Sequence, residues 1–589
     1  MKTQTHHSPP STPATAGEVT AGLPLNLKTI EQELAYPILI SESLKKSAKE
    51  AESFKSECQD LAILAEILLT KLRTTAGVLT SSTQPLYDRP VRRIAADCSR
   101  AMERGLGLSR RCRYGGGFLR RVVNTTIVES TEFHKTTALL EASVADLTWV
   151  VELYKTSLGT SEGDIVLSLP PVASNDPILS LVWSYMAVVI HGGTNPSERM
   201  KAVDSLTNLM RDNNRNKEII IEEGGVQPFL ALLKLKDTSI QIAACNALIN
   251  VANCKLGVSM ILGEHGAPTI THILSISPMK LQIEVAHLIS TMASDDPAAQ
   301  EEFARENVIL PLVMLLSLEL TGNEKQKREK ESPDVKLELK IACAEALHKL
   351  SSQNVENCRK ITETKGLLSL AKAIEVENGA LQYNCLLTLM EICSSAEYDD
   401  DLRRSAFKTN SYVGKFAATE LLRLAQQSST PHLQIPAIRS IGYLAHTFTR
   451  KDKFVFPPLI SQLNHFNPEV AIQAAISLRK FTCPANFNHV MHSKEVIEFG
   501  IVPLLLKMIT SGNEKSQLNG LILACDLAVN VEEESESLEV SKLLATFEAT
   551  RVSPLGQNPP LRELLPKAME QLEPGKDHRN LTLTTVGFD

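Results

Sequence analysis

The chain has 589 residues, of which 43% are hydrophobic and only 5% aromatic, and its formal net charge is −7. This content suffices for a large core of Leu, Ile, Val and Ala, and it excludes collagen-like and wholly disordered chains. The eleven Cys contain no C-x-x-C pair, which favours reduced thiols over a disulfide framework. Residues 1–20 lack the apolar core of a secretory signal and no run approaches a spanning helix, so we expect neither secretion nor membrane insertion.

The amino-terminal part predicts a helical bundle at 26–158. Apolar residues follow three- and four-residue steps from Leu44 to Leu72, as on one long helix or on two with a break, and again from Leu140 to Tyr154. The segment between Pro90 and Arg113 adds a further helix, and together these elements form a compact bundle.

Arginine is concentrated at 89–121, which contain ten Arg, no Lys and two acidic residues. The formal charge of this segment is therefore +8, whereas that of the rest of the chain is −15. At about 100° per residue, Arg93, Arg100, Arg104 and Arg111 lie within about 20° of one helix meridian. We predict that they bind an anionic membrane surface, with an ordinary solvated helix face as the alternative. Nucleic acid is disfavoured because no aromatic residues interleave the strip and the chain is acidic.

Three residues in this segment qualify that prediction. Gly105 and Gly107 weaken a helix, so the helix can end before Arg111 and leave it on a loop. Cys112 matches an S-acylation site, although a buried or unmodified thiol is the more common state.

From 178 to 530 the sequence repeats itself about every 40 residues, which is the period of HEAT and armadillo arrays. Three successive units begin with the segments IIIEEGGVQPFLALLK at 219–234, MILGEHGAPTITHIL at 260–274 and FARENVILPLVMLL at 303–316. Gly225, Gly266 and Asn307 are each 41 residues apart, and we expect the two Gly to supply a tight turn. A longer helix follows in each unit, and the pattern continues for about eight units.

The predicted fold is therefore all-α, an armadillo-repeat right-handed α-solenoid preceded by an amino-terminal helical bundle. A Gly-, Ser- and Pro-rich linker at 159–177 separates the two parts. We expect the extension at 1–25 and most of the polar segment at 531–589 to be disordered, apart from a capping helix around Leu561 to Leu572.

The final helix of each unit would line the concave surface of such a solenoid. Asn208 and Asn250 lie at matching places, and an Asn side chain both donates and accepts, as binding a peptide backbone requires. Arg211 is a candidate carboxylate partner. Local backbone hydrogen bonds for the Asn, and the helix C-terminus for Arg211, are the alternatives. Later units carry other residues at this place: Thr291, Lys349 and Glu391.

Catalytic patterns are absent from the sequence: it has no G-x-S-x-G, no phosphate-binding loop and no H-E-x-x-H. Cys483, His489 and His492 have ligand-like spacing but no fourth partner, so we predict no metal site. We expect no enzymatic activity, no cofactor and no small-molecule substrate.

Four motifs, in this order, resemble the plant Armadillo Repeat Only family: PILISESLKKSAKEAESFKSEC, LYDRPVRRIAADC, LPPVASNDPILSLVW and LMRDNNRNKEIIIEEGGVQP. They span the bundle, the linker and the first repeats. The resemblance implies a scaffold that engages Rho-of-plants GTPases and their GTPase-activating proteins and confines the active GTPase to a membrane domain in polarised growth. It also implies membrane association through the bundle, and hence a location in the cytoplasm and peripherally at the plasma membrane, with the nucleus as a further compartment.

Two other functions fit an armadillo array. Nuclear-import receptors pair groove Asn with groove Trp on successive third helices, whereas the only Trp here, Trp149 and Trp183, lie on no such helix. Ubiquitin ligases of the U-box and armadillo type carry a Pro-rich, short-stranded U-box, whereas the bundle region is helical throughout. Both an import-receptor-like adaptor and a substrate-binding ligase subunit are therefore disfavoured.

Overall fold

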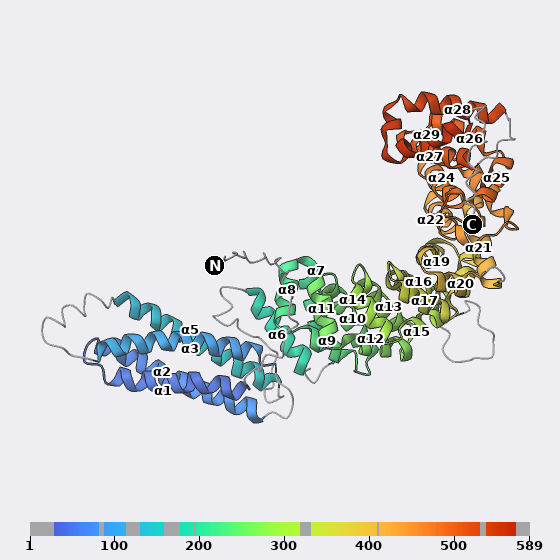
Figure 1. Cartoon of the computed structure of the whole chain (residues 1–589). Coiled ribbons are helices and arrows are strands. Elements are labelled where there is room, and N and C mark those ends of the chain that lie inside the picture. Colours follow the sequence, from blue (N-terminus) through green and yellow to red (C-terminus); the bar gives the residue numbers. More distant parts are fainter. Residues whose placement is uncertain are drawn as a thin grey trace, which may run out of the picture. The chain divides into compact units, whose positions relative to one another are not determined.

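The computed structural model describes residues 29–81, 87–113, 130–157, 177–191, 196–318, 332–408, 411–530 and 538–572. In these ranges the chain forms helices and turns without a strand, as predicted. Within them, no helix combines the length and the apolar character that crossing a membrane requires. The chain divides into two compact units, Met1–Ala202 and Val203–Asp589 (Figure 1). The extension at 1–25 lies outside the described residues, as does the linker up to residue 176.

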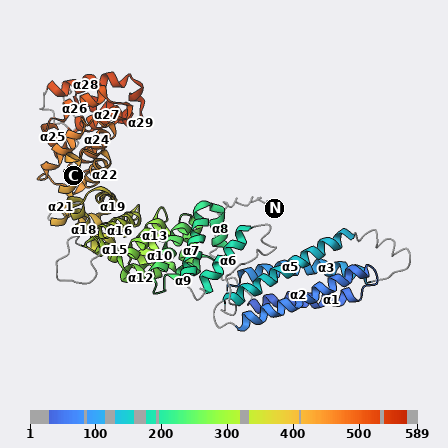
Figure 2. The ribbon, with the colours of Figure 1, turned by 180° about the vertical axis from the view of Figure 1, so that it is seen from behind.

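Among the described residues, four long helices form the bundle of the first unit (Figure 2). They are α1 (Ile30–Lys49), α2 (Lys55–Ser81), α3 (Arg89–Cys112) and α5 (Ser130–Ser157). Helices α1 and α5 each pack against both α2 and α3. The long apolar stripe therefore belongs to two helices, and the break between them includes Phe54, whose φ is 49°.

The apolar stripes fill the bundle core, because residues at three- and four-residue steps lie on the same side of a helix and pack against the neighbouring helices. Leu44, Leu61 and Leu72 are fully buried, as are Leu140 and Leu147 on α5. Burying a side chain of this size contributes about 1.5–3 kcal/mol.

Helix α6 (Pro177–His191) belongs to the first unit, where it packs against α5. The buried rings of Trp149 and Trp183 lie 6.1 Å apart between these helices. The sequence repeat had placed α6 in the solenoid, but the division between the units falls within α7 (Pro196–Asp212).

The second unit is a stack of three-helix repeats, because a short helix precedes the two helices of each predicted unit. The first two repeats are α8 (Asn214–Glu222), α9 (Val226–Leu232) and α10 (Thr238–Ala252), then α11 (Lys255–Gly263), α12 (Gly266–Ile276) and α13 (Met279–Ala293). The next two are α14 (Pro297–Arg305), α15 (Ile309–Leu316) and α16 (Pro333–Ser351), then α17 (Val355–Glu363), α18 (Gly366–Val376) and α19 (Gly379–Tyr398).

The later repeats follow the same order, except that in one of them 3₁₀ turns stand in place of the first α-helix. They are α20 (Asp400–Ala406), α21 (Tyr412–Gln427) and α22 (Pro431–Tyr443); 3₁₀ turns at Ala445–Thr447 and Lys453–Val455 with α23 (Phe456–Gln462) and α24 (Pro468–Thr482); and α25 (His489–Glu498), α26 (Ile501–Ser511) and α27 (Glu514–Val529). The last helices of the repeats pack side by side as α10, α13, α16, α19, α22, α24 and α27. We call these seven helices the third-helix row.

Gly225 and Gly266 lie at the turn between the first and second helices of their repeats, as expected, but neither has a positive φ. The left-handed residue is the preceding one, Gly224 with φ 81° and His265 with φ 53°. Gly225 is required for close packing instead, since a Cβ there would lie 2.9 Å from the carbonyl oxygen of Ile220. Gly266 meets its own repeat's first helix in the same way.

The segment after residue 530 is more ordered than predicted. Helices α28 (Leu538–Arg551) and α29 (Pro559–Leu572) pack against α26 and α27, with a 3₁₀ turn at Pro554–Gln557 between them. Phe547 and Leu561 are fully buried there. The predicted capping helix is thus present as α29. Helix α28 was not predicted, because the composition of the segment is polar.

A buried Gln near the start of the third helix caps the second helix in several repeats. In α13, Nε2 of Gln282 donates to the carbonyl oxygen of Leu274 at 2.8 Å. Gln241, Gln382 and Gln434 make the equivalent bond. Because the last carbonyls of a helix lack partners of their own, these bonds fix where each third helix begins.

Candidate interaction surfaces

One side of α3 is exposed and basic, and we call it the arginine face. It consists of the exposed side chains Arg89, Arg93, Arg100, Arg104, Arg110 and Arg111. The four residues predicted from their spacing are all among them. On the opposite side of α3, Val91, Cys98 and Met102 are fully buried, where the helix packs on α1 and α5. Arg89 and Arg110 also belong to this face, although they lie off the helix meridian of the four predicted Arg.

Helix α3 continues through its two Gly, so Arg111 lies on the helix with the other three predicted Arg, and the alternative of an earlier end is excluded. A Cβ at Gly105 would lie 3.2 Å from Cδ2 of Leu44 and 3.6 Å from Cγ2 of Thr136. Gly105 therefore lets α3 approach α1 and α5 closely, and this packing offsets its low helix propensity.

The charges of the arginine face are partly neutralised. Arg100 forms an ion pair with Asp97, and Nη1 of Arg111 lies 3.6 Å from a carboxylate oxygen of Glu132. The guanidinium of Arg93 lies 6.0 Å from the centre of the Trp183 ring, at cation–π distance. Arg104 and Arg110 form no ion pair with any part of the chain that the structure describes.

The net charge of α3 nevertheless remains strongly positive. The helix contains seven Arg and two acidic residues, a formal charge of +5. One of the two, Glu103, accepts a 2.6 Å hydrogen bond from the hydroxyl of Tyr36 on α1. The arginine face can therefore attract an anionic surface, and the attraction is sensitive to salt because the side chains are exposed.

The predicted protein-binding residues are only partly brought together. Nη1 of Arg211 donates to Oδ1 of Asn208 at 3.5 Å on the exposed side of α7. Asn250 is half-buried, and its Nδ2 donates to the carbonyl oxygen of Asn246 one turn earlier at 2.8 Å. Asn250 thus makes the local backbone bond that was the alternative to peptide binding.

The middle of the third-helix row carries acidic side chains that the sequence analysis missed. Glu284 on α13 has its pKa raised by burial and by the nearby Glu338 of α16, while His287 opposes that shift. On α16, Glu345 accepts a 3.2 Å hydrogen bond from Ser290, and its second oxygen lies 3.8 Å from Nδ1 of His287. In the sequence, these side chains could have been found as acidic residues that recur on successive third helices.

A groove of about 460 Å³ lies at the ends of α10, α13 and α16. Its charged and polar lining includes Lys255, Thr291, Asp295, Glu345 and Lys349. Two of these, Thr291 and Lys349, occupy the helix positions that match Asn208 and Asn250 of the earlier units. The groove therefore offers both charges and hydroxyl groups to a bound segment, but no Asn ladder.

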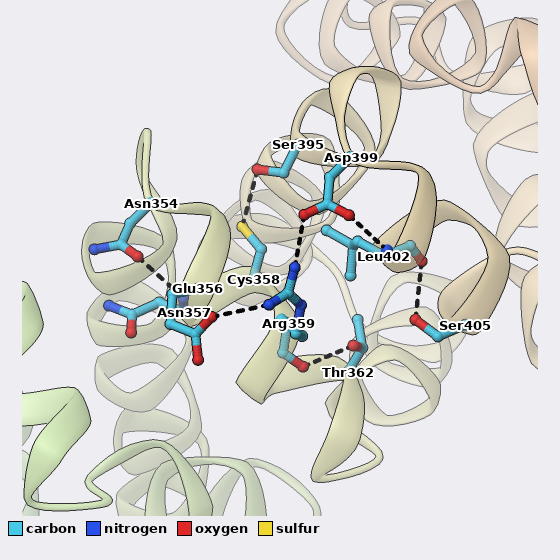
Figure 3. A network of polar contacts seen from close by, with 10 residues as sticks. All are labelled: Asn354, Glu356, Asn357, Cys358, Arg359, Thr362, Ser395, Asp399, Leu402 and Ser405. Atoms are coloured by element: carbon cyan, nitrogen blue, oxygen red, sulfur yellow. Dashed lines mark hydrogen bonds and ion pairs between the residues drawn. The ribbon is translucent and has the colours of Figure 1, made fainter.

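A polar network joins two successive repeats beside this part of the row (Figure 3). Arg359 on α17 lies 3.2 Å from Glu356 and 2.7 Å from Asp399, the N-cap of α20. Within the first of these repeats, the hydroxyl of Ser395 on α19 donates to Sγ of Cys358 on α17 at 3.4 Å. The Arg359–Asp399 pair thus joins the first helix of one repeat to the start of the next, whereas the Ser395–Cys358 bond joins the first and third helices of a single repeat.

The remaining sequence candidates form no site. The ring of His492 is 1% exposed, with Nδ1 3.3 Å from the carbonyl oxygen of Phe481. In the described ranges, His, Cys, Asp and Glu form no group that could hold a metal ion. Trp149 and Trp183 are buried in the first unit, so neither ring is available for a peptide groove.

Comparisons with known proteins divide the chain in the same way. Residues 31–155 match a domain of unknown function, DUF7792, and these limits coincide with the bundle. Residues 213–252 match the armadillo/β-catenin-like repeat, which is the repeat α8 to α10. Neither description names a catalytic activity. No curated protein matches the chain.

Among solved structures, an engineered protein determined by the Northeast Structural Genomics Consortium has a TM-score of 0.55 and 17% identity, over 73% of this chain and 96% of its own. A designed armadillo repeat protein has a TM-score of 0.37 and 16% identity, over 45% and 99% of the two chains. Another, crystallised with the peptide (KR)4, has the same values. The repeat match and the first of these structures agree with the three-helix units: the second part of the chain is an armadillo-repeat solenoid.

Proposed function

We propose that this protein is a non-enzymatic scaffold of the Armadillo Repeat Only type. In this proposal the bundle binds anionic membrane, and the solenoid binds Rho-type GTPases or their GTPase-activating proteins to confine polarity signalling in polarised plant growth. The protein then works in the cytoplasm and at the plasma membrane. The observation that carries the proposal is the arginine face, a strongly positive surface on the bundle, which is the part that resembles the family's membrane-associated region.

The membrane part of the proposal follows from simple electrostatics. Each basic residue near an anionic headgroup layer contributes about 1 kcal/mol, and the contribution disappears within a Debye length. Six exposed Arg on one helix, partly offset by Asp97 and Glu132, give reversible binding. High salt should release it.

A vesicle sedimentation assay tests this part. Arg100→Glu with Arg104→Glu should abolish binding to vesicles that contain phosphatidylserine, and neutral phosphatidylcholine vesicles should not bind either protein. The matched control is Lys234→Glu with Lys236→Glu, which changes the net charge equally at exposed positions of the solenoid. Unchanged binding of the arginine variant, or equal loss in both variants, contradicts binding through the arginine face.

The single variants should differ because the two Arg have different surroundings. Arg100 is already paired with Asp97, whereas Arg104 forms no ion pair with the described chain. Arg104→Glu should therefore weaken vesicle binding more than Arg100→Glu. Equal losses would indicate that only total charge matters.

The solenoid part of the proposal concerns the third-helix row and the start of the solenoid. The exposed pair Asn208 and Arg211 presents a cation there, and the groove at Lys349 presents both signs of charge. Such mixed polar surfaces are typical of regulated protein contacts rather than of permanent apolar interfaces.

A pull-down against Rho-type GTPases, loaded with GDP or a GTP analogue and with or without a GTPase-activating protein, tests this part. We expect binding to at least one of these states and a loss with Arg211→Glu. Arg305→Glu is the matched control, because Arg305 is an exposed cation on a first helix, and its ion-pair partner among the described residues is Glu302 in its own turn. Binding to none of the GTPase states would refute the specific proposal while leaving the vesicle result standing.

A further inference from the structure

Three third helices of the solenoid meet at one ion pair, although two of them are not neighbours in the stack. Nζ of Lys480, in the last turn of α24, donates to Oε1 of Glu397, near the end of α19, at 2.5 Å. Helix α22 lies between them in the third-helix row and packs against both. The ring of Tyr443, the last residue of α22, has its centre 4.2 Å from the same Nζ, at cation–π distance.

Close packing of α22 and α24 brings Lys480 within reach. A Cβ at Gly442 on α22 would lie 2.7 Å from Oγ and 3.0 Å from Cα of Ser477 on α24. The hydroxyl of Ser477 donates to the carbonyl oxygen of Ile438 on α22 at 2.8 Å. A larger side chain at Gly442 would therefore force the two helices apart.

The lengths of the helices leave a path for the lysine side chain. Helix α22 has 13 residues and ends at Tyr443, whereas α19 has 20 residues and continues to Tyr398. The side chain of Lys480 therefore passes the end of α22, across the ring of Tyr443, and meets Glu397 on the far side.

The carboxylate of Glu397 depends on this lysine. Its side chain is 12% exposed, and that of Lys480 is 27% exposed. The second oxygen of Glu397 is buried without a hydrogen-bond partner among the described residues. Nη1 of the nearby Arg403 donates to the backbone carbonyls of Ala396 and Glu397 at 3.0 and 2.9 Å. Within the described ranges, Lys480 is thus the ion-pair partner of this carboxylate, and partial burial limits screening by salt.

We propose that the Lys480–Glu397 pair, closed over Tyr443, is a clasp that fixes the curvature of the third-helix row at α22. In a solenoid each repeat contacts its neighbours, so one interface sets the angle at each boundary. The clasp adds a tie between two repeats that are separated by a third. Two helix spacings amount to about 16–20 Å, which leaves the two side chains little slack, so the row cannot open at α22 while the pair is intact.

The clasp has a consequence for binding. The curvature of a solenoid shapes its concave binding surface, and the third helices line that surface. The clasp thereby sets the curvature that a bound segment meets at α19, α22 and α24. This role goes beyond the proposed function, because it does not depend on which partner the solenoid binds.

Distance measurements across α22 in the full chain test the proposal. Nitroxide labels are attached to p-acetylphenylalanine in place of Glu301 on α14 and Lys567 on α29, two exposed positions on opposite sides of the clasp. Double electron–electron resonance then gives the distribution of distances, and we expect a single narrow one. Lys480→Met removes the ammonium group but keeps an unbranched side chain. It should lengthen the mean distance and broaden the distribution, because opening a curved row separates its ends.

Further variants identify the pair as the cause. Glu397→Gln should reproduce the change, and the double variant should add nothing to it, because both substitutions break the same contact. Lys480→Arg keeps the cation and should keep the narrow distribution. The matched control is Lys507→Met, because Nζ of Lys507 donates to Oδ1 of Asn464 at 2.7 Å between neighbouring repeats; it should leave the distribution unchanged.

Two results would overturn the proposal. One is an unchanged distribution in Lys480→Met, and the other is a broad distribution already in the labelled chain without further substitutions. The second measurement decides even where Lys480→Met does not fold.

Discussion

Nη2 of Arg359 lies 2.7 Å from Oδ2 of Asp399, and this pair ties the first helix of one armadillo repeat to the N-cap of the next. The other oxygen of Asp399 accepts the backbone N–H of Leu402 at 2.9 Å. One carboxylate thus serves as both helix cap and ion-pair partner across a repeat boundary. In a solenoid each repeat contacts only its neighbours, so such a residue acts on one interface alone.

Substitutions at Asp399 should separate these two roles. Asp399→Asn keeps an N-cap oxygen but loses the charge, whereas Asp399→Ala loses both, so we expect Ala to cost about 1 kcal/mol more than Asn. Hydrogen exchange of the peptides from α17 and α20 measures the effect where it arises. Equal protection in the two variants would show that the cap contributes nothing.

The Arg359 interaction should depend on pH. The backbone bond from Leu402 and the nearby Arg359 hold the pKa of Asp399 below its usual value of 3.8. Because the folded pKa is lowered, the ionised carboxylate stabilises the repeat fully above the unfolded pKa, and the stabilisation is lost as the pH falls through the folded pKa. Urea unfolding of wild type and Asp399→Asn should therefore converge as the pH falls below about 3.8, and a difference that grows toward acid would contradict the assignment.

The Gln caps of the third helices should each stabilise their repeat. Gln282→Leu leaves the carbonyl oxygen of Leu274 without its 2.8 Å bond, and because Gln282 is 7% exposed, water cannot replace it freely. We expect a loss of about 1–3 kcal/mol in the unfolding free energy. The control Gln427→Leu, at an exposed position of α21, should change it little, and similar losses in both would rule out the cap as the cause.

Glycine substitutions should distinguish close packing from helix propensity. Gly225→Ala places a methyl group 2.7 Å from Cγ2 of Ile220, and we expect it to cost about 1–3 kcal/mol. Gly263→Ala adds its methyl group where no atom lies within 4 Å, so it should stabilise α11 by up to about 1 kcal/mol. Thermal unfolding compares the two, and a stabilising Gly225→Ala would refute the packing explanation.

The sequence by itself determined the helices, the repeat frame and the exposure of the four predicted Arg, because amphipathic periodicity is a local property of a helix. It also indicated reduced thiols rather than a disulfide framework, because the eleven Cys contain no C-x-x-C pair.

Only the tertiary structure decided the contacts that join distant segments. Packing against Leu44 carries α3 through Gly105 and keeps Arg111 helical, although local propensity favours an earlier end. Packing against α26, α27 and α29 likewise orders α28, in a segment whose polar composition predicted disorder. In each case the residues that pack against the helix are distant in the sequence, so the spacing of apolar residues along the chain could not predict these contacts.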